Sequence, residues 1–128
     1  MSHFLSCPMI DKIYSHFKPF LLSLYPYEIT LEEKAFGIYK EITNRTTLRN
    51  YLTYQIRIVT FRNRNINTTN RNVKQFLIES ILKTIDKDIK EQYIVAKHKD
   101  QIQFFEDSFL IENIIAVITN GKIILRIK

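Results

Sequence analysis

Arginine and lysine side chains gather in one stretch of the chain, between Ile42 and Ile78. The stretch contains no aspartate or glutamate, and its basic residues are Arg45, Arg49, Arg57, Arg62, Arg64, Arg71 and Lys74. A guanidinium group donates paired hydrogen bonds in a geometry that matches phosphate oxygens. Seven asparagines in the same stretch add neutral donors and acceptors that suit sugar hydroxyls and base edges. These residue types predict binding of a polyanion such as a nucleic acid.

This basic stretch accounts for almost the whole net charge. The chain of 128 residues has 19 basic and 13 acidic side chains, which gives a formal charge of +6. Without the seven basic residues of the stretch, the remainder is close to neutral. A positive field concentrated in one place indicates an anionic partner, whereas scattered lysines mainly favour solubility. The alternative is a solvated, asparagine-rich loop encoded by an AT-rich genome.

Catalytic and metal-binding patterns do not stand out. The three histidines are far apart and Cys7 is the single cysteine, so no zinc or iron–sulfur spacing exists. The acids Asp86, Asp88 and Glu91 are interleaved with lysines, which is typical of a solvated face and not of an acid/base pair. There is no glycine-rich phosphate loop and no nucleophile elbow. We therefore expect no enzymatic activity, no metal, no cofactor and no small-molecule substrate.

Length and composition indicate one globular domain. Hydrophobic residues make up 45% and charged residues 25% of the chain. No apolar run is long enough to cross a membrane, and a single cysteine cannot form an internal disulfide. Residues 1–17 lack arginine and contain Asp11, so they make a poor transit peptide. We expect an N-terminal extension over 1–17, with a short amphipathic turn, and a single domain over 18–128.

Local patterns in the first half predict a strand, a helix, a second strand and a loop. Alternating apolar residues predict strands over 20–25 and 52–58, the second with Arg57 on its solvated face. Thr30 and Glu33 have the spacing of a capping box, which predicts a helix from there through Ile42. No periodicity survives over 62–72, which indicates an extended loop.

Two segments in the second half are ambiguous. Residues 73–90 fit either a helix, with apolar side chains at helical spacing, or a strand over 73–80. Residues 92–104 predict a strand. Near the C-terminus, Asn120 and Gly121 stand between two apolar runs, the strongest short-range signal for a hairpin. A helix over 108–117 that ends near Gly121 is the alternative.

Three segments resemble the family of the tenth small-subunit ribosomal protein, S-ten, in their order and spacing. They are LLSLYPYEITLEEKAFGIYKEI (21–42), IDKDIKEQYIVAKHKDQIQF (85–104) and IENIIAVITNGKIILRIK (111–128). The second is the closest, because several side chains match the family pattern as they stand. These are Asp86, Lys87, Glu91, Gln92, Tyr93, His98 and Lys99.

The resemblance implies a ferredoxin-like α+β fold, with an antiparallel sheet, two helices on one face and a long basic hairpin over about 57–80. It also favours a strand over 73–80 and a helix over 108–117. It implies a structural constituent of the small ribosomal subunit head that binds rRNA and neighbouring head proteins and supports translation. The RNA-binding residues expected are Arg45, Arg49, Arg57, Arg62, Arg64, Arg71, Lys74, Lys97, His98 and Lys99.

Ile, Lys and Asn are abundant, a bias that indicates an AT-rich genome. This bias favours a mitochondrial ribosome and a gene carried by the organelle, with a plastid or a bacterial cytoplasm as alternatives. Two other functions stay open. One is a non-ribosomal nucleic-acid-binding or transcription-antitermination module, and the other is a protein-interaction domain with an incidental basic loop.

Overall fold

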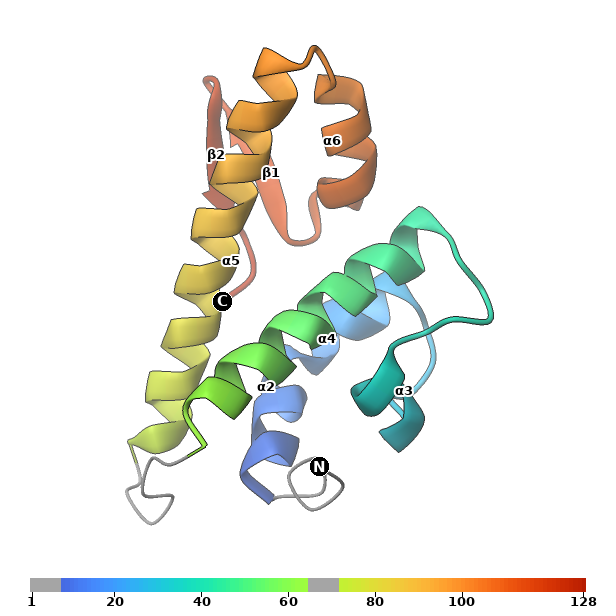
Figure 1. The fold of residues 1–128 in the computed structure, drawn as a ribbon, viewed down its shortest axis with the longest axis vertical. Coiled ribbons are helices and arrows are strands. Elements are labelled where there is room, and N and C mark those ends of the chain that lie inside the picture. Colours follow the sequence, from blue (N-terminus) through green and yellow to red (C-terminus); the bar gives the residue numbers. More distant parts are fainter. Residues whose placement is uncertain (1–7, 65–71) are drawn as a thin grey trace.

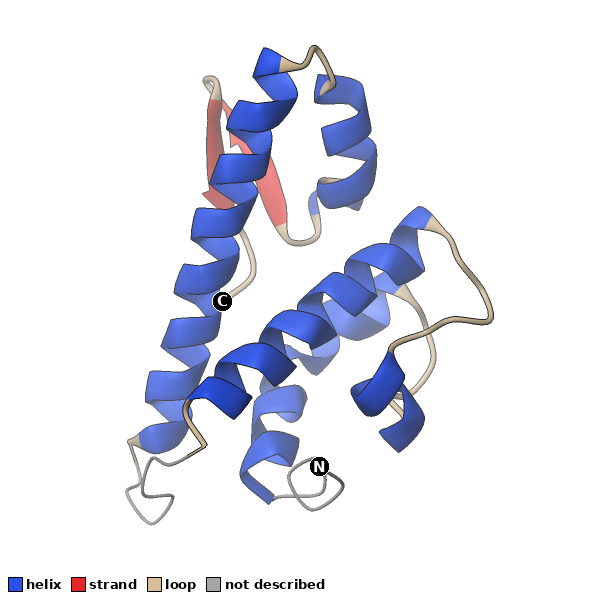
Figure 2. Ribbon diagram, viewed as in Figure 1, coloured by secondary structure: helices blue, strands red, loops and turns tan. Residues whose placement is uncertain are grey.

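The computed structural model describes residues 8–64 and 72–128. The elements in chain order are α2 (Pro8–Leu24), α3 (Leu31–Phe36), α4 (Asn44–Arg62), α5 (Val73–His98), α6 (Ile102–Phe109), a 3-10 turn η1 (Ile111–Asn113), β1 (Ala116–Thr119) and β2 (Lys122–Leu125). In the described part of the chain, the only sheet is the two-stranded antiparallel pair of β1 and β2 (Figure 2). The predicted ferredoxin-like α+β fold, with its long basic hairpin over 57–80, is therefore wrong.

The long helix α5 connects the two halves of the molecule (Figure 1). Its N-terminal half packs with α2 and α4, and its C-terminal half is flanked by α6 and the hairpin of β1 and β2. The core lies between these elements. His16 on α2 hydrogen-bonds through its Nε2 to the backbone oxygen of Lys128, at 2.7 Å, so the C-terminus returns to the first helix.

The strand predicted over 20–25 is the second half of α2. The buried apolar residues of α2 recur at three- and four-residue intervals: Ile10, Ile13, Tyr14, Phe17, Leu21 and Leu24. The helical spacing seen in residues 10–17 therefore continues past Pro19, and the helix crosses the expected boundary between residues 17 and 18. Pro19 cannot donate the helix bond to Ser15. Both residues are exposed, so water can satisfy the Ser15 carbonyl.

The strand predicted over 52–58 is the middle of α4. The buried residues Leu48, Leu52, Ile56 and Val59 follow the helical period, while Tyr54 is 47% exposed. An apolar residue at every fourth position satisfies both an alternating and a helical pattern, so the alternation was misleading. The N-terminus of α4 is fixed by a capping box, in which Thr43 and Thr46 hydrogen-bond to each other's backbone N–H.

Both ambiguous segments differ from the structure that the family resemblance favours. In each, the local residue pattern indicated the structure that is found. Residues 73–98 are helical, and α5 buries Ile78, Ile81, Ile85 and Ile89 at three- and four-residue spacing. The strand over 73–80 that the resemblance favours is therefore wrong.

The helix over 108–117 that the resemblance favours is wrong, because these residues form the end of α6, the η1 turn and the start of β1, and a hairpin follows. Asn120 and Gly121 have φ of 53° and 74°, as the tight turn of a two-residue hairpin requires, and Thr119 pairs with Lys122. The strand predicted over 92–104 is also wrong, because these residues form the end of α5 and the start of α6.

The predicted helix after Thr30 begins as expected and ends early. The Thr30 side chain accepts a hydrogen bond from the Glu33 N–H at 3.0 Å, which confirms the Thr30 half of the predicted capping box. The Glu33 carboxylate binds Arg49 instead. The helix stops at Phe36 because Gly37 has φ of 77°, and a Cβ there would lie 3.0 Å from Asn50 Oδ1. The predicted apolar face is not buried, since Leu31 is 57% and Ile42 78% exposed.

Tyr14 allows a test of the core. Its hydroxyl is buried without a hydrogen-bond partner among the described residues. Tyr14→Phe removes an unsatisfied polar group, so we expect the free energy of unfolding to stay constant or rise by up to about 1 kcal/mol. Tyr51→Phe is the matched control, because Tyr51 donates to Asp88 Oδ2 at 2.5 Å. Loss of the Tyr51–Asp88 hydrogen bond should lower the free energy of unfolding by about 1–3 kcal/mol. Urea denaturation measures both, and a destabilised Tyr14→Phe would contradict the packing described here.

The buried Tyr14 hydroxyl should also make the stability of the protein depend on pH. Burial raises the pKa of Tyr14 from 10 to about 12. On raising the pH, the unfolded chain loses this phenol proton first, so the wild type loses stability between pH 10 and about 12. The loss from this group is about 1 kcal/mol per pH unit. Denaturation at pH 9 and 11 should therefore show a steeper alkaline loss in the wild type than in Tyr14→Phe.

Candidate nucleic-acid interface

The basic residues expected to bind RNA divide into three groups in the structure. The first group, which makes contacts within the fold, is Arg45, Arg49 and Arg57. The second, exposed where α4 ends and α5 begins, is Arg62, Arg64 and Lys74. The third, exposed at the C-terminal end of α5, is Lys97, His98 and Lys99. Arg71 lies outside the described residues.

Arg49 is a structural residue. Its side chain is fully buried, and its Nε and Nη2 donate to the two carboxylate oxygens of Glu33 at 2.7 and 2.6 Å. Its Nη1 donates to the backbone oxygen of Leu21, in the last turn of α2, at 3.2 Å and to that of Tyr25, just after the helix, at 2.6 Å. One guanidinium group thus joins α4 to both α2 and α3. It is not available to RNA, and the sequence-based assignment of Arg49 to the interface does not fit this geometry.

Arg45 and Arg57 are also engaged within the protein. Arg45 donates through Nη1 to the Ser23 backbone oxygen at 3.1 Å and forms an ion pair with Glu112. Arg57 is half-buried, donates to the Lys34 backbone oxygen at 3.0 Å, and lies 5.5 Å from the centre of the Tyr54 ring. These contacts depend on tertiary partners that are far away in the sequence. A charge pattern alone could not reveal them.

Arg62, Arg64 and Lys74 form what we call the α4–α5 end. All three are exposed, and among the described residues none of them pairs with a carboxylate. The Arg64 guanidinium lies 4.1 Å from the centre of the Phe61 ring and donates to the Phe61 backbone oxygen at 3.0 Å. That contact holds the side chain in place and uses only one of its nitrogens. Lys74 lies in the first turn of α5, where the helix dipole adds positive potential.

A polar cavity of about 390 Å³ lies between α4 and α5 beside Arg62. Its lining includes Tyr54, Lys87, Asp88 and Glu91. The two carboxylates oppose a phosphate inside the cavity. Phosphate contacts are therefore expected on the outer surface of the α4–α5 end.

The third group adjoins a basic cavity that the sequence did not indicate. Lys97 lies 4.4 Å from the centre of the Tyr93 ring. Together with Lys90 and Lys122, it lines a cavity of about 310 Å³ between α5 and the hairpin. Lys90 is paired with Asp86 at 2.9 Å. Lys122 was missed because only the position of the hairpin brings it beside α5.

The two exposed basic groups stand at opposite ends of one helix. Lys74 and Lys97 are separated by 23 residues of α5, which spans about 35 Å at the rise of an α-helix. They do not form one continuous patch. An RNA that contacts both must extend along the length of α5.

Some asparagines of the basic stretch also serve the fold. Asn50 receives a hydrogen bond from the Ile38 N–H at 2.7 Å and donates to the Ile38 backbone oxygen at 2.8 Å. Asn63 donates to the Val59 backbone oxygen at 2.8 Å. Residues 65, 67 and 70 lie outside the described part of the chain. The suggestion that asparagines contact sugar and bases is therefore restricted to fewer side chains than the sequence indicated.

Comparisons with protein-family models, curated proteins and solved structures found no match to this chain. Among the described residues, no group of three or more His, Cys, Asp and Glu side chains is placed to hold a metal ion. None of the described helices is both long and apolar enough to cross a membrane.

The separation of structural from exposed arginines can be tested by substitution. Arg49→Met leaves the Glu33 carboxylate buried without its partner, so it should lower the free energy of unfolding by about 3–5 kcal/mol. Arg62→Met removes the same charge from an exposed site and should change it by less than about 0.5 kcal/mol. Chemical denaturation measures both. Equal stability of the two variants would show that Arg49 does not hold the fold.

Proposed function

We propose that the protein binds RNA without catalysing a reaction, as a component of a ribonucleoprotein particle. The observation that supports this most is the α4–α5 end, where three exposed cations have no carboxylate partner within the described residues. Unpaired guanidinium and ammonium groups at one end of a helix pair would neutralise phosphates and release their counterions. Lys97, His98 and Lys99 would supply a second contact farther along the RNA.

The particle we propose is the small subunit of a mitochondrial ribosome. Its support is the abundance of Ile, Lys and Asn, which AT-rich codons encode, together with the concentrated charge and the residue matches within 85–104. In this proposal the protein contacts small-subunit rRNA and neighbouring head proteins. The ferredoxin-like fold that the resemblance implied no longer supports the proposal, because the described residues form a helical fold instead. RNA binding itself depends only on the exposed basic groups.

A charge-removal series tests RNA binding. Arg62→Gln, Arg64→Gln and Lys74→Gln combined should weaken binding to a short RNA hairpin about tenfold at moderate salt. The slope of log affinity against log salt should become shallower by about two to three, since each lost phosphate contact contributes about 0.7–0.9. Fluorescence anisotropy across a salt series gives both quantities.

The matched control removes three cations elsewhere, as Lys18→Gln, Lys40→Gln and Lys128→Gln combined. It has the same net charge as the first variant and should keep most of the slope. Equal loss in both triple variants would show that affinity follows net charge, and would contradict a defined interface at the α4–α5 end.

Sedimentation tests the particle. The tagged protein from its native source is run on a sucrose gradient, and fractions are analysed by mass spectrometry. We expect one copy for each small ribosomal subunit, retained at moderate salt, and a shift to the top of the gradient for the Arg62, Arg64 and Lys74 variant. If the wild type sediments at the top, the ribosomal proposal is wrong. If it then still binds RNA, a non-ribosomal module is the better account.

A further inference from the structure

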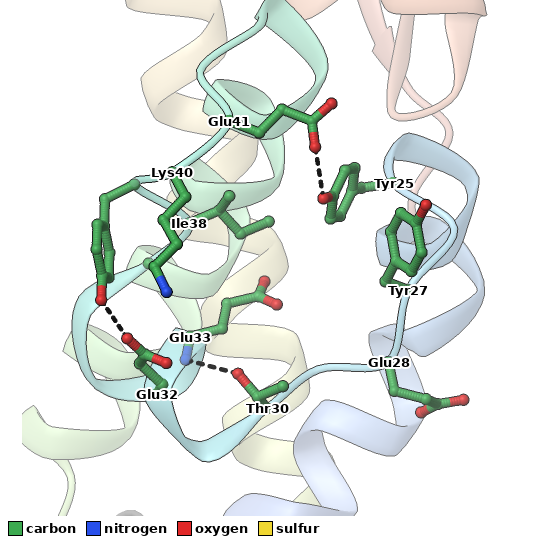
Figure 3. Close-up of a pocket in the computed structure, with 11 residues that line it drawn as sticks. Tyr25, Tyr27, Glu28, Thr30, Glu32, Glu33, Ile38, Lys40 and Glu41 are labelled. Carbon is green, nitrogen blue, oxygen red and sulfur yellow. Dashed lines mark hydrogen bonds between the residues drawn. The ribbon is translucent and has the colours of Figure 1, made fainter.

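The segment that joins α2 to α4 forms a cavity that is open to solvent and differs in character from the basic groups. It has a volume of about 250 Å³ and is lined by aromatic and acidic side chains, chiefly Tyr25, Tyr27, Tyr39, Glu32 and Glu41. Figure 3 shows Tyr25 and Tyr27 on one side of this cavity, and Ile38, Lys40 and Glu32 on the other. The two walls come from the segments before and after the short helix α3, and α3 itself contributes Glu32.

Two consecutive residues of α4 hold these walls in place. Arg49 binds the Tyr25 backbone oxygen at 2.6 Å, behind the first wall. Asn50 binds both backbone groups of Ile38, behind the second wall. Gly37 allows the sharp turn between α3 and the second wall, since its φ is 77°. The cavity is therefore built by the fold and does not need a ligand to bring its walls together.

The carboxylates of the cavity differ in whether they are neutralised. Glu33 is paired with Arg49, and Glu28 is paired with Lys18 at 3.0 Å. Within the described part of the chain, Glu32 and Glu41 form no ion pair. Lys40 also lines the cavity, so two unpaired carboxylates face one ammonium group, and the lining keeps a net negative charge on a protein whose formal charge is +6.

The two unpaired carboxylates accept hydrogen bonds from tyrosines of the lining. Tyr25 donates to Glu41 at 2.7 Å, and Tyr39 donates to Glu32. These hydrogen bonds raise the pKa of both phenols above the ordinary value. The bonds also fix the ring orientations and polarise the rings toward negative charge. An electron-rich ring face attracts an organic cation.

The chain's own Lys40 shows that an ammonium group fits beside this lining. Its Nζ lies 5.8 Å from the centre of the Tyr39 ring, within the range of a cation–π contact. Tyr27 is 62% and Tyr39 53% exposed, so both rings can also be reached from solvent. Tyr25 and Tyr27 stand with ring centres 4.7 Å apart and planes tilted by 54°, and present two ring surfaces at an angle.

We propose that this cavity, between the Tyr25–Tyr27 wall and the Ile38–Glu41 wall, binds an alkylammonium group. The cation is carried by a lysine side chain of a basic partner protein or by a free polyamine, which share the same chemistry. This site is separate from the α4–α5 end and does not depend on RNA binding.

Isothermal titration with three probes tests the proposal. The probes are a blocked glycine-lysine-glycine peptide, the same peptide with its lysine acetylated, and spermidine. Weak, millimolar binding is expected for the charged peptide, for spermidine or for both, and none for the acetylated peptide. Binding of the charged peptide indicates a protein partner, and binding of spermidine alone indicates a polyamine site.

Two variants separate a built cation site from general attraction to negative charge. Tyr27→Leu removes a ring and keeps the bulk, and should weaken binding roughly two- to fivefold, the range of one exposed cation–π contact. Glu41→Gln removes charge and keeps an acceptor for Tyr25, and should weaken binding to a similar extent. Tyr54→Leu and Glu79→Gln are the matched controls outside the cavity and should leave binding unchanged.

Three results would overturn the proposal. They are the absence of binding for both cationic probes, equal binding of the acetylated peptide, and full affinity in Tyr27→Leu. The last would show that carboxylates alone attract the cation. Because all four substitutions are at surface or half-exposed positions, thermal denaturation should show that the variants remain folded.

Discussion

The buried ion pair between Arg49 and Glu33 is the interaction on which the N-terminal half of the molecule depends. The fixed fork of the guanidinium group binds both oxygens of one carboxylate and two backbone oxygens at the C-terminal end of α2, those of Leu21 and Tyr25. Three helices thereby share one polar contact within an apolar core. Since a buried charge without its partner is costly, the arrangement also specifies how α2, α3 and α4 fit together.

The contacts of Arg49 show that the basic residues of the stretch are not equivalent in the fold. In the sequence, all of its cations look equivalent, because each lies in a segment without acidic residues. In the fold, a cation on the core side of α4 meets the carboxylate or carbonyl of another element, and a cation beyond the end of α4 meets solvent. Only the second kind can neutralise a phosphate without breaking a bond that the fold needs. The interface we propose is therefore smaller than the charge pattern suggests and lies at one end of the helix pair.

Arg49 also helps to position the cavity that is lined by tyrosines and glutamates. Arg49 fixes the backbone of one wall, and its neighbour Asn50 fixes the backbone of the other. The molecule therefore presents two surfaces of opposite character, a basic one at the α4–α5 end and an acidic, tyrosine-lined one around α3. Such a protein could contact an anionic and a cationic partner at the same time.

Local residue chemistry predicted part of this structure well. The Thr30 cap, the helical spacing in residues 10–17 and the turn at Asn120 and Gly121 are properties of short segments, and all three are confirmed. The spacing of Ile78, Ile81, Ile85 and Ile89 also indicated the helix that is found, although the family resemblance favoured a strand there. Where the resemblance decided between two structures, it chose the wrong one at both places.

Other features could not be predicted from the sequence. The strand expected over 52–58 failed because apolar residues four apart fit both periodicities, and only burial separates them. The continuation of α2 through Pro19 depends on solvent reaching the carbonyl that proline leaves free. The roles of Arg45, Arg49 and Asn50 depend on partners at least 12 residues away in the sequence. The ribosomal assignment stays a prediction.

The most direct test of the central claim, that exposed and structural arginines are distinct, is ultraviolet crosslinking of the wild-type protein to RNA followed by mass spectrometry of its peptides. The account predicts crosslinks on peptides around Arg62, Arg64 and Lys74, at the α4–α5 end. It predicts none on the α4 segment around Arg45 and Arg49. Crosslinks concentrated at Arg45 and Arg49, with none at the α4–α5 end, would contradict it.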